Sequence, residues 1–550
     1  MSTRQRTAAG IASVLSAVLV LSSCGRQSAG SPTTDEQPSE KVSNSWKLTG
    51  SSATSSFEPL SIGTGWGPTA AEITRARVLV GRLSLRQRAG QVIVASYSGT
   101  SAPARLVNDL HLGGVVVFSE NITSPGQIRL SNQALQRSVT RSGRDWPAFV
   151  GVDQEGGRVA RVTSGATRFP TFMTAGAARD RALTRKAYAA SGGELAGLGF
   201  TTDFAPVADV TMGPRDPAIG ARSAGSSPTR VTAQSVAAMN GFASSGIVPV
   251  LKHFPGHGSV TTDSHAGLPV QAKSLRALRD TDLVPFRHGI AAGAPSVMVG
   301  HLDVRAVDPG MPSSLSRKVV TGLLRQEMGF KGLAVTDSLV MGAVVDRFGS
   351  ARAAVRALRA GEDVVLMPRS ARAARDGIAA AVREGRLSQA RLDQAATRQV
   401  ALLLHQKAQG FSKRPAGSSG AVSRQLSAAA MTVVKGSCSA RLVGRSVHVT
   451  GPSTAVARFR SAASAAGLPT GRRGSTVRLV GYGGAAARGD VVVALDTPYV
   501  LGRSRAGTAK IAAYGDTPGA MRALVAVLLG RAEAPGTLPV GVADVPRRGC

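Results

Sequence analysis

The stretch KHFPGHGSVTTDSH, residues 252–265, gathers three histidines, a lysine and an aspartate within a short span. It contains two glycines and a proline and has no apolar run, which is typical of a loop at a functional site rather than of core. These residue types permit three kinds of chemistry. They are metal binding by the histidines, a phosphate cradle around GHGS, and proton transfer by a histidine paired with an aspartate.

The spacing of these residues favours proton transfer. His253 and His257 match an HxxxH metal pattern, but the Pro-Gly pair between them disfavours the helix that the pattern needs. A phosphate cradle would require more glycines and a following helix. Asp263 precedes His265 by two residues, so a tight turn brings its carboxylate to the ring, where it would fix the tautomer and raise the affinity for a proton. We therefore expect a catalytic loop without metal or cofactor, with a solvated surface loop as the alternative.

A second candidate segment is GVDQEGGRVAR, residues 151–161, in which Asp153 ends an apolar run and two glycines follow. The glycines would let a ligand come close to the backbone. A carboxylate near the guanidinium groups of Arg158 and Arg161 suits hydrogen bonding to sugar hydroxyls or to an amide. A buried structural Asp–Arg pair explains the same residues equally well.

The third candidate is Asp337 in KGLAVTDSLVMGA, residues 331–343, where it follows an apolar run. A carboxylate at this position could act as a nucleophile, a base or a metal ligand. It could also simply cap the next helix.

Eight short β-branched runs alternate with helical stretches between about residues 90 and 370, and this pattern predicts parallel strands with helical crossovers. Eight such units favour a closed (β/α)₈ barrel over an open doubly wound sheet, and no GxGxxG follows the first run. Barrel enzymes gather their chemistry at the carboxyl ends of the strands, where Asp153, Lys252, His253, His301 and Asp337 all fall. The runs are 91–96, 113–118, 148–153, 200–207, 247–254, 296–302, 332–338 and 363–368.

Beyond the barrel, assigned to residues 71–405, a polar stretch at 406–425 is typical of a linker. Residues 426–550 alternate strand-like runs, at 431–436, 446–451, 476–481 and 490–495, with helical stretches, which predicts a smaller α/β domain. The domain holds no dense polar cluster, so we expect a structural or binding role for it.

The N-terminus predicts export. MSTRQR is followed by the apolar IASVLSAVLVL and by LSSC, which resembles a bacterial lipobox ending at Cys24. We expect a signal peptide at 1–23, a lipid on Cys24 that anchors the chain to a membrane, and a flexible tether at 24–70. A plain secretory signal is the alternative. In that compartment Cys438 and Cys550 are expected to form a disulfide.

The formal net charge of +33 raises the question of a nucleic-acid partner. The basic residues are scattered along the chain and no nucleic-acid-binding module is present, so we expect none. Attraction to anionic cell-wall polymers or lipid headgroups is compatible with the same charge.

Taken together, the motifs resemble glycoside hydrolase family 3, and most closely its NagZ-type β-N-acetylglucosaminidases. The resemblance covers roughly residues 75–405 and rests on four segments, while the C-terminal domain is similar to the α/β sandwich that many members carry. The segments are KHFPGHGSVTTDSH, GVDQEGGRVAR, IGARS at 219–223 and GLAVTDSLVM at 332–341.

This resemblance implies a role for each matched residue. Asp337 corresponds to the nucleophile, His265 to the acid/base and Asp263 to the partner of that histidine. The residues that correspond to those that bind the N-acetylglucosamine ring are Asp153, Arg161, Arg222, Lys252 and His253.

The resemblance further implies a retaining exo-β-N-acetylglucosaminidase that acts through a covalent glycosyl-aspartate on peptidoglycan fragments, with no cofactor. We expect a monomer on the extracellular face of the cytoplasmic membrane, or secreted. A phosphorylase, a β-glucosidase and a non-catalytic wall-binding lipoprotein remain alternatives.

Overall fold

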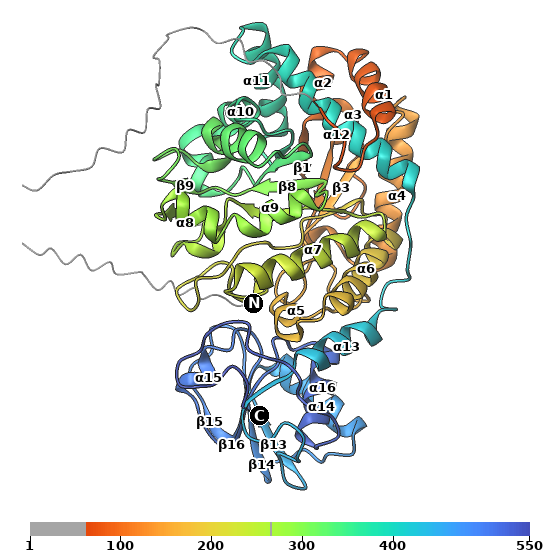
Figure 1. Cartoon of the computed structure of the whole chain (residues 1–550). Coiled ribbons are helices and arrows are strands. Elements are labelled where there is room, and N and C mark those ends of the chain that lie inside the picture. Colours follow the sequence, from red (N-terminus) through yellow and green to blue (C-terminus); the bar gives the residue numbers. More distant parts are fainter. Residues whose placement is uncertain (1–61, 265–266, 550) are drawn as a thin grey trace, which may run out of the picture. The chain divides into compact units, whose positions relative to one another are not determined.

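The computed structural model describes residues 62–264 and 267–549 (Figure 1). The signal peptide, Cys24, most of the tether, His265 and Cys550 lie outside these residues, so the predictions for them stay predictions. The barrel and the C-terminal sheet belong to one compact unit.

A closed barrel of parallel strands forms the first part of the described chain. One sheet has the order β11-β1-β2-β3-β4-β5, and a second has the order β10-β8-β6. The two sheets join because β5 runs into β6 and because parallel bridges link Val207 to Lys252 and Val335 to Val364. The predicted eight-stranded barrel is thus confirmed. Its strands are β1 Ile93–Ser96, β2 Gly114–Val117, β3 Phe149–Val152, β4 Thr202–Asp203, β5 Val248–Pro249, β6 Leu251–Phe254, β8 Ser296–Val299, β10 Leu333–Thr336 and β11 Val365–Leu366.

Each of these strands coincides with one of the eight apolar runs. Strands β2 (GVVV) and β3 (FVGV) are buried along their whole length, as expected for parallel strands covered on both faces. Gly151 in β3 is needed for packing, because a Cβ there would lie 2.8 Å from the ring of Phe204. The ring of Phe204 therefore occupies the space beside Gly151 in which another residue type would place its side chain.

Helices surround the strands (Figure 1). Several begin at a side-chain cap, including α4 at Ser124, α6 at Asp180 and α7 at Ser227. The helices are α1 Ala70–Gly81, α2 Leu85–Gln91, α3 Ala104–Leu110, α4 Pro125–Arg141, α5 Met173–Ala178, α6 Arg181–Gly197, α7 Pro228–Ser244, α8 Leu275–Asp280, α9 Val284–Ala291, a helix of wide turns at Lys318–Glu327, α10 Gly342–Ala360, α11 Ala371–Arg383 and α12 Gln389–Gln409. A small parallel pair, β7 Val270–Gln271 and β9 Asp303–Val304, lies outside the barrel sheets.

After α12, helix α13 (Gly420–Ala430) leads into a five-stranded sheet of order β12-β16-β15-β14-β13. All neighbours are parallel except β12 and β16, which are antiparallel. This is the predicted smaller α/β unit, although β16 was missed from the sequence. Its elements are β12 Thr432–Lys435, β13 Val447–Thr450, α14 Ser453–Ala465, β14 Ser475–Val480, β15 Arg488–Ala494, α15 Val500–Arg503, β16 Arg505–Ala512 and α16 Pro518–Leu528.

Cys438, in the loop after β12, is disulfide-bonded. The other two cysteines of the chain, Cys24 and Cys550, lie outside the described residues, so the Cys438–Cys550 pairing remains a prediction.

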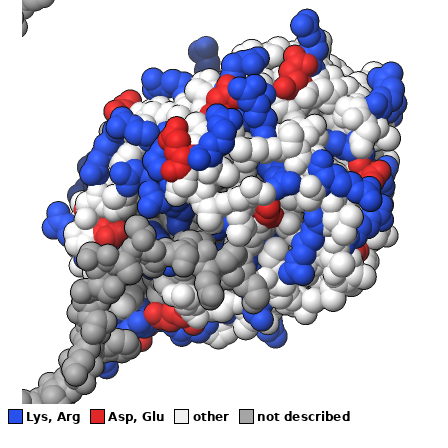
Figure 2. Space-filling model, turned by 90° about the horizontal axis from the view of Figure 1, so that it is seen from above, with Lys and Arg blue, Asp and Glu red and all other residues white. Residues whose placement is uncertain are grey.

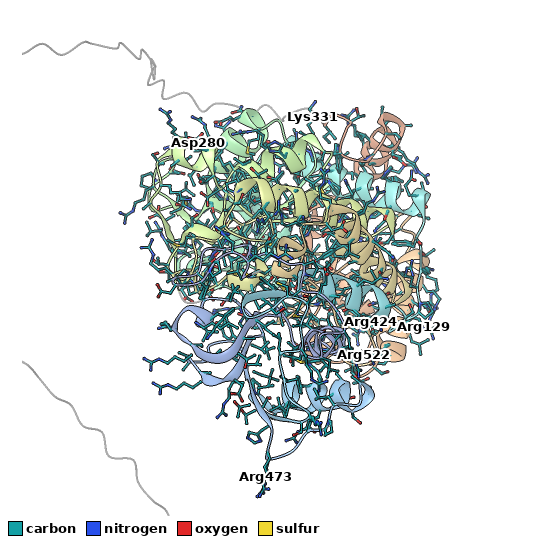
Figure 3. The ribbon with its side chains drawn as sticks, turned by 60° about the horizontal axis from the view of Figure 1, so that its bottom comes forward. Arg129, Asp280, Lys331, Arg424, Arg473 and Arg522 are labelled. Carbon is teal, nitrogen blue, oxygen red and sulfur yellow. The ribbon has the colours of Figure 1, made fainter. Side chains whose placement is uncertain are left out.

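The surface carries its positive charge in a dispersed form. On the face seen in Figure 2, Lys and Arg side chains are spread over the surface with fewer Asp and Glu among them. Exposed basic side chains such as Lys331 and Arg473 point away from the ribbon (Figure 3). Within the described ranges, no helix combines the length and the apolar character needed to cross a membrane.

Candidate active site

A cavity of about 290 Å³ opens at the carboxyl ends of the barrel strands. The site residues matched through the family resemblance line it, with the exception of His265, which lies outside the described residues; Arg158 and His301, also considered from the sequence, are not among the lining residues. These lining residues are Asp153, Arg161, Arg222, Lys252, His253, Asp263 and Asp337. The structure therefore brings together segments that lie up to about 180 residues apart in the chain.

Asp337 directly follows the last residue of β10 and is half-buried in the cavity wall. Its Oδ1 accepts a 2.7 Å hydrogen bond from the backbone N–H of Ser338. It does not cap the next helix, since the N-cap position of α10 is Met341. Burial alone would raise the pKa of Asp337, but nearby His253, His301 and Lys252 hold that pKa below its ordinary value. The carboxylate is therefore ionised at neutral pH, as a nucleophile must be.

A buried ionic network forms one wall of the cavity. Lys252 Nζ lies 2.9 Å from Asp153 Oδ1 and 2.6 Å from Glu155 Oε1. Arg222 donates two parallel hydrogen bonds to Glu155, of 2.9 and 2.8 Å. Arg161 Nη2 lies 3.3 Å from the second oxygen of Asp153. Asp153 is thus both an ion-pair partner and a cavity wall, which combines the two interpretations that the sequence left open.

The pKa values in this network show that its charges stabilise one another. Burial would raise the pKa of Glu155, but Arg222 and Lys252 hold that pKa well below its ordinary range. Burial would lower the pKa of Lys252, but Asp153 and Glu155 raise it above the usual lysine value. Lys252 therefore stays cationic beside the cavity at neutral pH.

Glu155 was missed from the sequence, although it lies two residues after Asp153 in the same quoted segment. Its spacing of two from Asp153 was the available signal, since alternate residues at a strand end share a face.

His253 is held by a second residue that the sequence analysis missed. Its Nδ1 lies 2.7 Å from Asp209 Oδ2, and its backbone N–H also donates to Asp209. Burial would raise the pKa of Asp209, but His253 and His257 lower it, so this buried carboxylate stays ionised. An ionised acceptor at Nδ1 places the ring proton there and leaves Nε2, which is 3.4 Å from Arg222 Nη2, toward the cavity.

The loop after β6 carries the proton-transfer candidates. His257 is buried, with Nε2 3.0 Å from Ser264 Oγ, and burial together with His253 lowers its pKa to about 4, so it is neutral at neutral pH. Asp263 and Ser264 line the cavity. The position of His265 stays a prediction. No group of three or more His, Cys, Asp or Glu side chains suited to a metal occurs among the residues that the structure describes.

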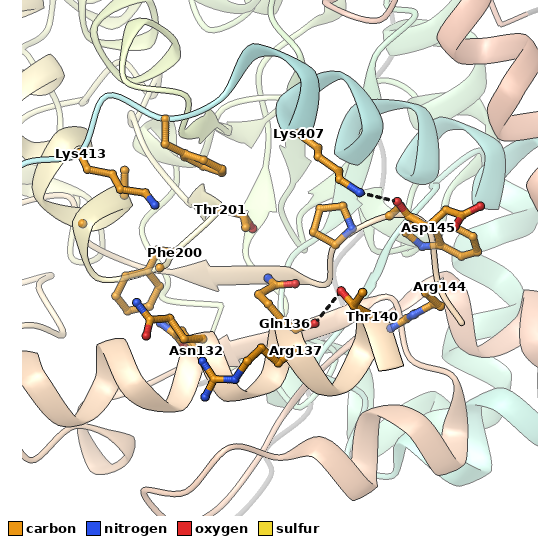
Figure 4. Close-up of a pocket in the computed structure, with 17 residues that line it drawn as sticks. Asn132, Gln136, Arg137, Thr140, Arg144, Asp145, Phe200, Thr201, Lys407 and Lys413 are labelled. Atoms are coloured by element: carbon orange, nitrogen blue, oxygen red, sulfur yellow. Dashed lines mark hydrogen bonds between the residues drawn. The ribbon is translucent and has the colours of Figure 1, made fainter. Parts of the chain in front are cut away.

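A second cavity, of about 410 Å³, lies near the amino ends of β3 and β4 (Figure 4). It has aromatic walls, including Trp146 and Phe200, and Lys407 Nζ donates a 3.0 Å hydrogen bond to the backbone oxygen of Asp145. Asp145 is the one carboxylate in its lining. This cavity lacks the facing acidic groups that glycosyl chemistry requires, so the cavity around Asp337 is the candidate active site.

Comparison with known proteins agrees with this geometry. Residues 84–402, more than half of the chain, match the model of the glycosyl hydrolase family 3 N-terminal domain. The chain therefore belongs to glycosyl hydrolase family 3, and this membership places it among the glycoside hydrolases.

Two relatives of the chain are β-hexosaminidases. The chain is 36% identical over 369 residues to the β-hexosaminidase LpqI of Mycobacterium tuberculosis, covering 64% of this chain and 90% of that protein. It is 36% identical over 281 residues to β-hexosaminidase A of Pseudoalteromonas piscicida, covering 48% of this chain and 47% of that protein, so it spans about half the length of this relative.

A solved family 3 β-N-acetylglucosaminidase from Paenibacillus sp. str. FPU-7 has a similar fold, with a TM-score of 0.76 and 28% identity. The match covers 84% of this chain and 99% of that one, a share larger than the barrel alone.

Proposed function

We propose that the protein is a retaining exo-β-N-acetylglucosaminidase that releases terminal N-acetylglucosamine from peptidoglycan-derived fragments. The observation that carries the proposal is Asp337, an ionised carboxylate at the mouth of the barrel, beside the cations of a sugar-sized cavity. Family membership and the names of the relatives support the same class of substrate.

The mechanism proceeds by two displacements. An oxygen of Asp337 attacks the anomeric carbon, the glycosidic C–O bond breaks, and His265 gives its proton to the leaving oxygen. His265 then takes a proton from water, whose oxygen attacks the anomeric carbon and displaces Asp337. Two inversions at one carbon retain the anomeric configuration. Asp263, two residues before His265 and at the cavity wall, would orient the ring and favour its protonated form.

The wall opposite the loop supplies the groups that hold the sugar. Asp153 and Lys252 offer an acceptor and a donor side by side, Arg161 and Arg222 add donors around them, and Nε2 of His253 adds an acceptor. Such groups match vicinal hydroxyls and an acetamido oxygen. The cavity of about 290 Å³ suits one pyranose ring, which supports exo action on a terminal residue.

The cellular setting is also part of the proposal. A lipid on Cys24 would anchor the chain on the extracellular face of the cytoplasmic membrane, or the chain would be secreted, and in either place it meets cell-wall fragments. The protein would act as a monomer, without cofactor and without a nucleic-acid partner.

The test is turnover by the purified chain of nitrophenyl N-acetyl-β-glucosaminide and of muropeptides, with and without inorganic phosphate, with products identified by mass. Free N-acetylglucosamine, lost in Asp337→Ala, is expected. A sugar 1-phosphate made only with phosphate would instead identify a phosphorylase. Faster release from the glucoside that lacks the acetamido group would identify a β-glucosidase. Peptidoglycan binding without any turnover would contradict an enzymatic role.

A further inference from the structure

The smaller C-terminal α/β domain, from β12 onward and called the C-terminal unit below, contacts the hairpin that carries Asp153 and Arg161, two of the proposed sugar-binding residues. We propose that Asp496 and Tyr482 of this unit are positioning residues, which grip Arg158 at the hairpin tip and so hold Asp153 and Arg161 in place for the sugar. The inference rests on the proposed function, and it assigns a role to the C-terminal unit in substrate binding.

The hairpin, residues 153–162, is a small closed structure with Arg158 at its tip. Gly156 and Val159 pair through backbone hydrogen bonds of 3.1 and 3.2 Å. At its base, Gln154 Oε1 accepts from the backbone N–H groups of Arg161 and Val162, at 2.8 and 3.0 Å. Because the turn is closed on itself, a displacement at its tip is passed to both of its ends.

The tip is held from the C-terminal unit by two different contacts. The guanidinium carbon of Arg158 lies 3.6 Å from the ring centroid of Tyr482, in the loop after β14. Its Nε lies 3.4 Å from Oδ1 of Asp496, which follows β15. Asp496 Oδ1 is buried and has no well-aligned hydrogen bond among the described residues, so the nearby charge of Arg158 is its main compensation. A cation held between a ring face and a carboxylate has a defined position.

The C-terminal unit also contacts a second loop of the cavity, the loop that carries Arg222. These contacts are mainly apolar. Ala221, next to Arg222, packs in one cluster with Ala494, Val500 and Leu501. The backbone N–H of Ser226 donates to Pro539 O at 3.2 Å. The hairpin and the loop of Arg222 therefore both contact the C-terminal unit. Of these two loops, the hairpin is the one whose described contacts include a charged side chain, Arg158, which a single substitution can remove.

The energetics separate a positioning role from a purely structural one. The side chains of Arg158 and Tyr482 are 38% and 61% exposed, so their mutual contact adds little to stability. The side chain of Asp496 is only 9% exposed, so Arg158→Ala leaves a buried carboxylate without its cation and should lower stability, whereas Asp496→Ala removes that carboxylate together with the contact. Small displacements of binding groups, in contrast, lower the affinity for substrate strongly. Asp496→Ala and Tyr482→Ala should therefore affect sugar binding with little change in the stability of the fold.

The experiment compares Arg158→Ala, Asp496→Ala, Tyr482→Ala and the double variant Arg158→Ala/Asp496→Ala in the full chain. With the nitrophenyl N-acetylglucosaminide, we expect KM to rise roughly tenfold while kcat changes less than about twofold, because the grip acts on ground-state and transition-state binding alike. The double variant should be no worse than the more affected single variant, since both break one contact.

Two control variants accompany these. Arg473→Ala removes an exposed arginine of the same unit and should leave KM unchanged, and Tyr482→Phe keeps the ring face and should restore most of the wild-type KM. Additive effects of the two single changes, or an unchanged KM in all variants, would overturn the proposal. So would a KM effect that accompanies a lower unfolding midpoint in every variant.

A readout that needs no turnover separates this proposal from the proposed function. Amide hydrogen exchange of residues 153–162 should become faster in Asp496→Ala than in wild type or Arg473→Ala. If the wild-type chain releases no sugar, the proposed function fails while the exchange result still decides whether the grip exists. Unchanged exchange in the hairpin would refute the grip in either case.

Discussion

Two buried ionic clusters lie at opposite ends of the barrel strands. At the carboxyl ends, Asp153, Glu155, Lys252 and Arg222 form a network beside the cavity. At the amino end of β11, Asp363 accepts from three buried arginines, with Arg391 and Arg398 at 3.0 and 3.1 Å and Arg325 also in contact. Both clusters contain carboxylates whose pKa values are displaced downward, so displaced pKa values alone do not identify the site of chemistry.

The two ends of the strands differ in whether a carboxylate is occupied by cations or remains open to a ligand. Both oxygens of Asp363 are occupied by guanidinium groups, and its neighbour Glu362 is buried, with a pKa raised well above the ordinary value by desolvation. Asp337 forms no ion pair with any of the described residues, and it lines an open cavity. A carboxylate kept ionised by charges around it, yet open to a ligand, can react, whereas a fully paired one can only stabilise the fold.

The largest expected effect is on the reactive side of this comparison. Asp337→Ala should reduce kcat by about 10⁴-fold or more, because the atom that forms the covalent intermediate is removed. The unfolding midpoint should stay close to that of wild type, since the carboxylate is half-buried and unpaired among the described residues. Steady-state kinetics and thermal unfolding measure the two quantities. Activity within tenfold of wild type would mean that another residue is the nucleophile.

A change in the cluster at the amino ends of the strands should instead lower stability and leave kcat unaffected. Asp363→Ala leaves three buried arginines without their counterion, which should cost about 3–5 kcal/mol of unfolding free energy. Urea denaturation followed by circular dichroism measures this loss. The protein that remains folded should keep the wild-type kcat, and a lower kcat per folded molecule would contradict a purely structural role.

The sequence could predict the barrel and most of the cavity lining because both depend on local patterns. Each strand is a short buried run, and each predicted site residue lies at the carboxyl end of a run or in the loop that follows it. The strand β16, RAGTAKIA, was missed since its residues are small and its burial is irregular. Its place in the sheet comes from pairing with β12 and β15 rather than from its own pattern.

Residues whose role depends on contacts between distant segments could not be predicted. Asp209 is 44 residues from His253, and its orienting role is visible only when the two loops meet. Glu155 gains its importance from Arg222, in the loop after β4, and from Lys252, in β6. Asp363, at the opposite end of the strands, likewise depends on distant segments, because its three arginine partners come from two helices.

An intermediate effect is expected for Glu155→Gln, which keeps the shape of the side chain and removes its charge. Lys252 and Arg222 then lose their shared counterion and would shift toward Asp153 and the cavity. We expect kcat/KM to fall roughly 100-fold, mainly through KM, with a smaller loss of stability than in Asp363→Ala. Kinetics and urea denaturation on both variants make the comparison. A Glu155→Gln variant that binds substrate normally would show that this network is only structural.

The smallest expected effect concerns the pH dependence of the reaction. The pKa of Asp337 lies below its ordinary value because cationic and polar neighbours outweigh burial, so this carboxylate, the proposed nucleophile, loses its charge only in strongly acidic solution. Lys252→Met removes one of those positive charges and should move the acid limb of kcat/KM to higher pH. Arg325→Met, which acts on the cluster at the other end of the strands, should leave the limb in place. An equal shift in both variants would mean that the limb reports acid unfolding, which follows the depressed pKa of Asp363 and destabilises the chain as the pH falls through it.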